Sequence, residues 1–220
     1  MTSRERSIDT SRGPARAVVS RPPRPAEPIG LAILLHGAGT DTSAAPLPVM
    51  AEALTAAGVV AVRFDQPYRV AGRRSPDPAH LLDRVLLEAL PQLRRYGPGL
   101  PLVFAGRSSG ARVACRCAEQ ADARAVACLG FPWRPPQGRS AEPRPDRGGE
   151  LRAAAARVPV LVLQGERDPF GMPRRGRNVT LRRFPAVAHI PTEAMAMAAT
   201  SWLVERLQGT RQEVGAFPRR

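Results

Sequence analysis

A serine flanked by glycines, Ser108, is the sequence feature that most constrains how this 220-residue chain can fold. It stands in the pentapeptide GRSSG at 106–110, which follows the apolar run PLVFA at 101–105 and precedes the helix-like stretch ARVACRCA at 111–118. Strand, sharp turn and helix form the setting in which a G-x-S-x-G pattern holds a nucleophilic serine. Such a turn needs small residues beside the serine and pushes its hydroxyl above the edge of the sheet. The pentapeptide alone also fits an ordinary glycine-rich turn before a helix.

A second informative segment lies upstream. Residues 30–35 (GLAILL) form a continuous apolar run, which is typical of a strand buried on both faces. The run ends in HGAG at 36–39, which predicts a loop of small residues after His36. We interpret His36 as a residue that orders this loop rather than as a catalytic base. Downstream, the amide of Ser109 would lie at a helix N-terminus, where it could bind an oxyanion.

A third segment carries two acidic residues after a predicted strand. Residues 158–164 (VPVLVLQ) predict a buried strand that runs into GERDPFG at 165–171. Asp168 is our choice for a catalytic acid, and Glu166, two positions nearer the strand, is its competitor. Taken alone, an aspartate before a proline more commonly starts a turn. Position in the chain favours the acid.

His189 is the candidate base. It follows a strand-like run at 178–184 and precedes a helical stretch at 192–207. A lone histidine is more often structural than catalytic, but the chain contains three histidines and His189 is the one that follows the candidate acid.

Together these segments resemble the α/β-hydrolase superfamily, over about Ala15 to Leu207. The chain looks most similar to small bacterial predicted hydrolases of the dienelactone-hydrolase-like part, which are similar to the hydrolase-like domain of a subunit of the NSL histone acetyltransferase complex. The segments that carry this resemblance are LHGAGTD at 35–41, RFDQPYR at 63–69, AGRSSG at 105–110, LGFP at 129–132 and QGERDPFG at 164–171. The resemblance implies a compact α/β-hydrolase fold, with a mostly parallel sheet flanked by helices.

The resemblance also implies a site. Ser108, Asp168 and His189 occur in the chain order of a hydrolase triad. The loop after the first buried strand would supply a second oxyanion-hole amide, which we assign to Ala38, beside that of Ser109. The implied reaction is hydrolysis of a carboxylic ester or thioester through an acyl-enzyme, with neither a metal nor an organic cofactor.

The proline-rich segment 131–150 occupies the place where many α/β-hydrolases carry a cap domain. It has room for a loop only, so we predict an open site without a cap. Gly39 and Trp133 are candidate substrate-binding residues. For Trp133, packing against the sheet edge is an equally good interpretation.

The charge of the chain is the main argument for a different function. The formal net charge is +14, and all 33 basic residues are arginine, spread from Arg4 to Arg220. Such a charge could indicate nucleic-acid binding. However, aromatic residues make up 5% of the chain, no nucleic-acid motif is visible, and the absence of lysine indicates a compositional bias. We therefore expect a small-molecule ester as partner and no nucleic acid. A catalytically silent interaction module is the alternative.

The remaining expectations concern organisation. We predict a disordered basic tail at 1–14, one hydrolase domain at 15–208 and a disordered tail at 209–220.

No apolar run reaches the ~18 residues of a membrane span, and residues 1–28 lack the apolar region of a secretory signal. The odd count of three cysteines indicates reduced thiols and a cytoplasmic protein. Pro91 should kink or break the helix predicted from Ala79 to about Tyr96. The sequence predicts no oligomeric state.

Overall fold

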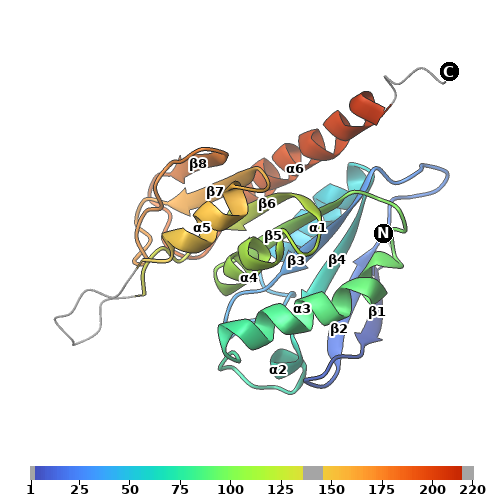
Figure 1. Cartoon of the computed structure of the whole chain (residues 1–220), viewed down its shortest axis with the longest axis horizontal. Helices are drawn as coiled ribbons and strands as arrows, with labels where there is room; N and C mark the ends of the chain where they lie inside the picture. Colours follow the sequence, from blue (N-terminus) through green and yellow to red (C-terminus); the bar gives the residue numbers. More distant parts are fainter. Residues whose placement is uncertain (1–2, 136–145, 215–220) are drawn as a thin grey trace.

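The computed structural model describes residues 3–135 and 146–214, which are built around a single eight-stranded sheet (Figure 1). Its strands run in the order β1-β2-β4-β3-β5-β6-β7-β8. The first two pairings, β1 with β2 and β2 with β4, are antiparallel, and all the others are parallel. The strands are β1 (Ser3–Ile8), β2 (Ala15–Ser20), β3 (Gly30–Leu35), β4 (Val59–Asp65), β5 (Leu102–Arg107), β6 (Ala123–Leu129), β7 (Val160–Gly165) and β8 (Val179–Phe184).

Helices cover both faces of the sheet, which gives three layers. One face packs against α3, α4 and α5, and the other against α1 and α6 (Figure 1). The short helix α2 follows β4. The helices are α1 (Leu47–Ala56), α2 (Pro67–Val70), α3 (Ala79–Arg94), α4 (Ser109–Cys117), α5 (Gly148–Ala155) and α6 (Glu193–Val214).

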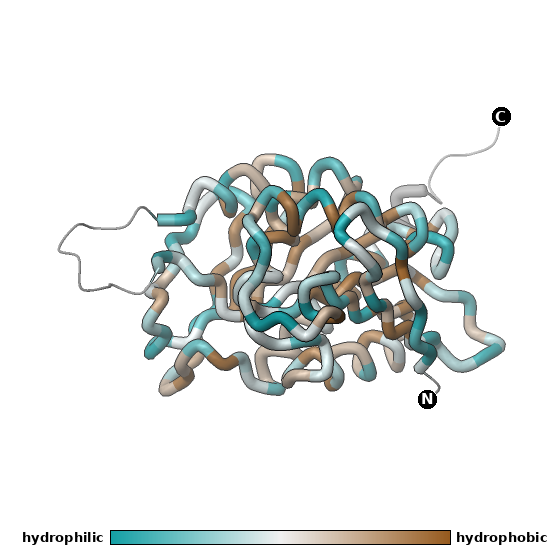
Figure 2. The backbone as a smooth tube through the Cα atoms, turned by 90° about the horizontal axis from the view of Figure 1, so that it is seen from below, coloured by the Kyte–Doolittle hydropathy of each residue, from teal (hydrophilic) through white to brown (hydrophobic). Residues whose placement is uncertain are grey.

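Strand β3 shows why apolar runs without alternation become central strands here. All six of its residues are buried. Leu31, Ile33 and Leu35 point into the core under α3–α5, whereas Ala32 and Leu34 point into the core under α1 and α6. Side chains alternate between the faces of a strand, so a strand covered on both faces must be apolar at every position. Viewed from below, hydrophobic stretches lie mostly inside and hydrophilic ones mostly in the outer loops (Figure 2).

The two ends of the chain differ from the prediction of disordered tails. Residues 3–8 form β1, which pairs along its whole length with β2 and buries Ile8. The turn after it is tied to α3, because Glu88 accepts hydrogen bonds from the amide and hydroxyl of Ser11. The polar composition of this segment reflects an edge strand with five exposed residues out of six. At the other end, α6 continues to Val214, beyond the predicted boundary at 208. Residues 215–220 lie outside the described residues.

Pro91 does not break its helix, since α3 runs through it to Arg94. Proline lacks the N–H that would bond to the carbonyl four residues earlier. The helix nevertheless keeps a buried face of Leu82, Val85, Leu86, Ala89 and Leu93, and this packing holds the last turn in place.

The predicted fold class is confirmed: a mostly parallel sheet flanked by helices, without a cap domain. Only residues 130–147 connect β6 to α5, and the predicted loop within them falls in part on 136–145, outside the described residues. No helix in the described part of the chain has the length and apolar composition needed to cross a membrane. Because β3, β5 and β7 are parallel, the loops after them meet at one edge of the sheet, where ligands bind in such folds.

Candidate active site

Ser108 occupies a strained turn between β5 and α4. Its backbone has φ 50° and ψ −112°, a positive φ that residues other than glycine rarely adopt. Such a conformation costs on the order of 1–3 kcal/mol and persists where the surroundings enforce it. Here its amide donates to the carbonyl of Leu129, 3.1 Å away at the end of β6. The turn therefore presents the serine side chain at the carboxyl edge of the sheet.

Close backbone contacts explain why the pentapeptide has glycine at both ends. A methyl group on Gly106 would overlap the backbone of Gly110 and Ala111, and one on Gly110 would overlap the carbonyls of Leu35 and His36. The backbone before the turn therefore contacts the backbone after it, and the first turn of α4 packs directly on the end of β3. Both glycines are needed because no side chain fits between these backbones.

His189 brings the serine and an acid together. Its Nε2 lies 2.7 Å from Ser108 Oγ, and its Nδ1 lies 2.9 Å from Asp168 Oδ2. The imidazole is partly open to solvent, with 20% of the side chain exposed, whereas the carboxylate is fully buried. The ring also packs on Phe170, with centroids 4.2 Å apart. The three residues follow three different strands and form one continuous hydrogen-bonded chain.

The Asp168 carboxylate is held from several sides. Its Oδ2 accepts from Nε2 of Gln164 at 2.8 Å, and its Oδ1 accepts from the amide of Phe170 at 2.8 Å. Gly165 lets the chain before His189 approach, because a methyl group there would overlap the carbonyl of Val187. Glu166 is exposed on the surface. The structure thus brings Asp168, and not Glu166, into contact with His189.

The loop after β3 lies beside the serine. A methyl group on Gly37 would be 3.5 Å from Ser108 Cβ. The Gly37 carbonyl accepts from His36 Nδ1 at 2.9 Å and from the amide and hydroxyl of Thr40. Since the N–H of a trans peptide points opposite to its carbonyl, the Ala38 amide points away from these groups. Among the described residues, it has no acceptor.

An ion pair with a buried carboxylate anchors the same loop. Asp65, at the end of β4, is fully buried and accepts the amide of Thr42 at 2.7 Å. Its other oxygen accepts from Arg16 of β2. A buried carboxylate is tolerated when it is paired and hydrogen-bonded, and here it ties the loop to the antiparallel side of the sheet.

His36 orders the loop from inside, as interpreted from the sequence. The Gly37 carbonyl can only accept, so Nδ1 carries the hydrogen, and Nε2 accepts the amide of Gln66 at 3.1 Å. Burial lowers the pKa of His36 below its ordinary value, and the bond to Gly37 opposes this only in part. The ring is therefore a neutral connector whose two nitrogens are both occupied.

The other two predicted site residues lie apart from this chain of hydrogen bonds. Gly39 has φ 72° and helps to turn the loop, close to the carbonyl of Arg74. Trp133 is buried between Gly171 and the first turn of α5. Its indole lines a pocket to which none of Ser108, Asp168 and His189 contributes. Trp133 thus packs on α5 and lies apart from Ser108, Asp168 and His189.

Sequence reasoning did not single out Gln164, Phe170 or Asp65. Gln164 and Asp65 are buried polar residues at or next to the last position of mostly apolar strands, β7 and β4, which is the signal that could have found them. Phe170 gave no such signal. Its contact with His189 joins two irregular loops, and no sequence pattern predicts which loop residues meet. The described residues contain no group of three or more His, Cys, Asp or Glu side chains that could hold a metal ion.

Comparison with known proteins agrees with this fold. The model of the alpha/beta hydrolase domain matches residues 29–213. The chain belongs to this family. No curated protein is similar enough to count as a relative. Among solved structures, a lidless serine hydrolase from Xanthomonas campestris is 24% identical, with a TM-score of 0.67 over 98% of this chain and 97% of that one.

Two further structures show the same fold. A dienelactone hydrolase from Anabaena variabilis is 18% identical, with a TM-score of 0.69 over 94% of this chain and 97% of that one. A thermostable carboxyl esterase from Bacillus coagulans is 13% identical, with a TM-score of 0.73 over 95% and 99%. At such identities the likeness concerns the fold.

Gly110→Ala should lower the free energy of unfolding by at least about 1–3 kcal/mol, because the added methyl group meets backbone that cannot rotate away. Urea unfolding followed by circular dichroism measures this. Gly149→Ala in α5 is the control: its methyl group meets nothing closer than 4.0 Å, and alanine should stabilise the helix by about 0.5–1 kcal/mol. Equal effects of the two substitutions would contradict the steric argument.

The neutral, buried His36 makes stability depend on pH. Its pKa is lowered in the folded protein, so the unfolded chain binds a proton at about pH 6.5 while the folded one does not. The free energy of unfolding should therefore fall as the pH drops through this value. His36→Asn should be less stable at neutral pH but show a shallower decline between pH 7.5 and 5.5. Parallel curves for the two proteins would show that His36 does not cause the decline.

Proposed function

We propose that this protein is a serine hydrolase that cleaves a carboxylic ester or thioester through an acyl-enzyme on Ser108. The observation that carries the proposal is the hydrogen-bonded chain from Ser108 Oγ through His189 to the buried Asp168. A serine hydroxyl is a weak nucleophile until a base takes its proton, and an imidazole at 2.7 Å is placed to do so.

The steps follow from this geometry. As Ser108 Oγ attacks the carbonyl carbon, His189 Nε2 takes the hydroxyl proton and then gives it to the leaving alcohol or thiol. Asp168 holds the Nδ1–H tautomer and stabilises the imidazolium. Water then attacks the acyl-serine, with His189 taking its proton and returning it to Oγ. The carboxylic acid leaves and the enzyme is restored.

The developing oxyanion needs donors that are already in place. The amides of Ala38 and Ser109 are our candidates: Ser109 follows Ser108 at the N-terminus of α4, and Ala38 follows Gly37, whose backbone lies beside Ser108. Fixed amides of this kind typically contribute ~10²–10³ in turnover each. The hydrogen bonds of Gly37, Thr42 and His36 would keep the Ala38 amide rigid.

The similar structures support the same class of reaction. Their names describe a serine hydrolase, a dienelactone hydrolase and a carboxyl esterase. Resemblance to the dienelactone-hydrolase-like group therefore remains part of the proposal, together with the hydrolase-like domain of the NSL complex. A cytoplasmic location and a small-molecule partner in place of nucleic acid remain predictions.

Ser108→Ala should abolish both hydrolysis of a short-chain p-nitrophenyl ester and labelling by a fluorophosphonate probe. Ser109→Ala is the matched control and should keep most of both, since alanine retains the backbone N–H. If deacylation limits turnover, the wild-type protein should release a burst of p-nitrophenolate equal to the enzyme present. A folded wild-type protein that reacts with neither reagent would favour the silent interaction module.

Asp168→Asn should lower ester turnover by ~10⁴, because asparagine cannot hold the required imidazole tautomer or stabilise its charge. Glu166→Gln removes a neighbouring surface carboxylate and should change turnover little. Steady-state kinetics of the two variants decide between the acids. A large loss from Glu166→Gln with little loss from Asp168→Asn would reverse the assignment.

A further inference from the structure

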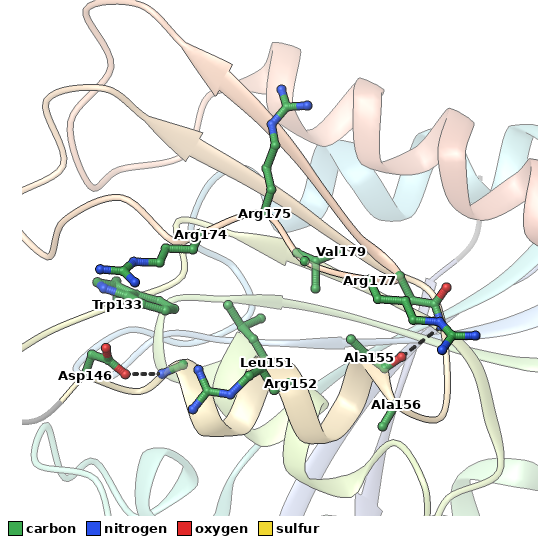
Figure 3. Close-up of a pocket in the computed structure, with 13 residues that line it drawn as sticks. Trp133, Asp146, Leu151, Arg152, Ala155, Ala156, Arg174, Arg175, Arg177 and Val179 are labelled. Carbon is green, nitrogen blue, oxygen red and sulfur yellow. Dashed lines mark hydrogen bonds between the residues drawn. The ribbon is translucent and has the colours of Figure 1, made fainter.

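A pocket of about 660 Å³ lies on the α5 side of the sheet, outside the hydrolytic triad. It exists because the connection from β7 to β8 contains no helix. Parallel strands are usually joined by a crossover helix that packs on the sheet. Here residues 166–178 run back as irregular chain, and a space remains between them and α5 (Figure 3).

Apolar side chains line part of this pocket. Trp133 contributes its indole, α5 contributes Leu151 and Ala155, and Val179 lies at the start of β8. Trp133 is 6% exposed and packs so closely on α5 that a methyl group on Gly148 would overlap its ring. The indole is therefore a fixed wall, suited to a flat or aliphatic group.

Four arginines line the same pocket: Arg152 from α5, and Arg174, Arg175 and Arg177 from the crossover. In Figure 3, Arg174 lies beside Trp133 and Arg152 extends toward the same end, whereas Arg175 points away. Within the described ranges, none of the four has a hydrogen-bond or ion-pair partner. The aspartate at this end, Asp146, accepts the amide of Gly148 at 3.0 Å.

The neighbouring arginines of α4 behave differently. Arg112 binds Glu150 with Nε at 2.9 Å, and Arg116 binds Asp83 and Glu150. Carboxylates of α3 and α5 thus neutralise these two arginines, which lie between the helices. The arginines around the pocket are left with their charge and donor geometry available.

We propose that this pocket binds a small organic anion with an aromatic or aliphatic body and a phosphate or carboxylate head. The body would lie against Trp133 and Leu151, and the head between Arg152 and Arg174. Planar guanidinium groups match the oxygens of phosphate and carboxylate. The volume lies in the range of small-molecule sites, which are mostly apolar with a few placed polar groups. Binding here does not depend on the proposed hydrolase activity.

Phenylphosphonate is a suitable probe, because it carries both parts of the proposed ligand and offers no ester. Titration should give a saturable change in tryptophan fluorescence that Trp202→Phe retains and Trp133→Phe loses. Calorimetry on the wild-type protein gives the affinity without a fluorescent reporter. Benzyl alcohol, which lacks the charged head, should bind at least about tenfold more weakly.

Paired variants separate a site from general surface charge. Arg152→Gln with Arg174→Gln should weaken phenylphosphonate binding by about ten- to hundredfold. Arg182→Gln with Arg183→Gln on β8 removes the same charge from exposed positions outside the pocket. This pair should change the affinity for phenylphosphonate by less than about twofold. Circular dichroism confirms folding of each variant. Equal weakening by both pairs, equal affinity for benzyl alcohol, or no saturable binding by folded wild-type protein would overturn the proposal.

Discussion

The close approach of three backbones around Ser108 is the constraint on which the rest of the site depends. The end of β3, the end of β5 and the first turn of α4 meet so tightly that only glycine fits at 106 and 110. This contact forces Ser108 into its positive φ and directs its hydroxyl to His189. The loop after β3 also lies beside the serine, at Gly37. The strained backbone of Ser108 is thus maintained by the packing of the residues around it.

The parallel sheet turns this local arrangement into a site. Loops after β3, β5 and β7, and the segment after β8, all arrive at the same edge, so residues more than eighty positions apart become neighbours. Two of these loops are then held by polar groups at strand ends. Asp65 holds the loop after β3, and Gln164 holds the acid. These two groups are buried and hydrogen-bonded, so the sheet itself fixes the loop after β3 and the position of Asp168.

The high arginine content has two different structural consequences. On α4, arginines are matched by Glu150 and Asp83, so they join helices rather than attract ligands. Around the pocket before β8, the arginines form no ion pair in the described part of the chain, although Asp146 lines the same pocket. The same residue type is structural in one place and available in the other. Composition alone could not separate the two, because what matters is whether an acid lies within reach.

The sequence by itself determined the central strands, the turn at Ser108 and the chain order of Ser108, Asp168 and His189, because each leaves a local signal: an unbroken apolar run, a glycine pair or a polar residue after a strand. It did not determine that residues 3–8 pair as an edge strand, since an exposed strand has the composition of a tail. It favoured Asp168 over Glu166 from position in the chain alone. Only the tertiary structure shows that Asp168 contacts His189, because this contact depends on how the loops after β7 and β8 pack. The pocket beside Trp133 was likewise decided by tertiary structure, through a helix that the crossover lacks.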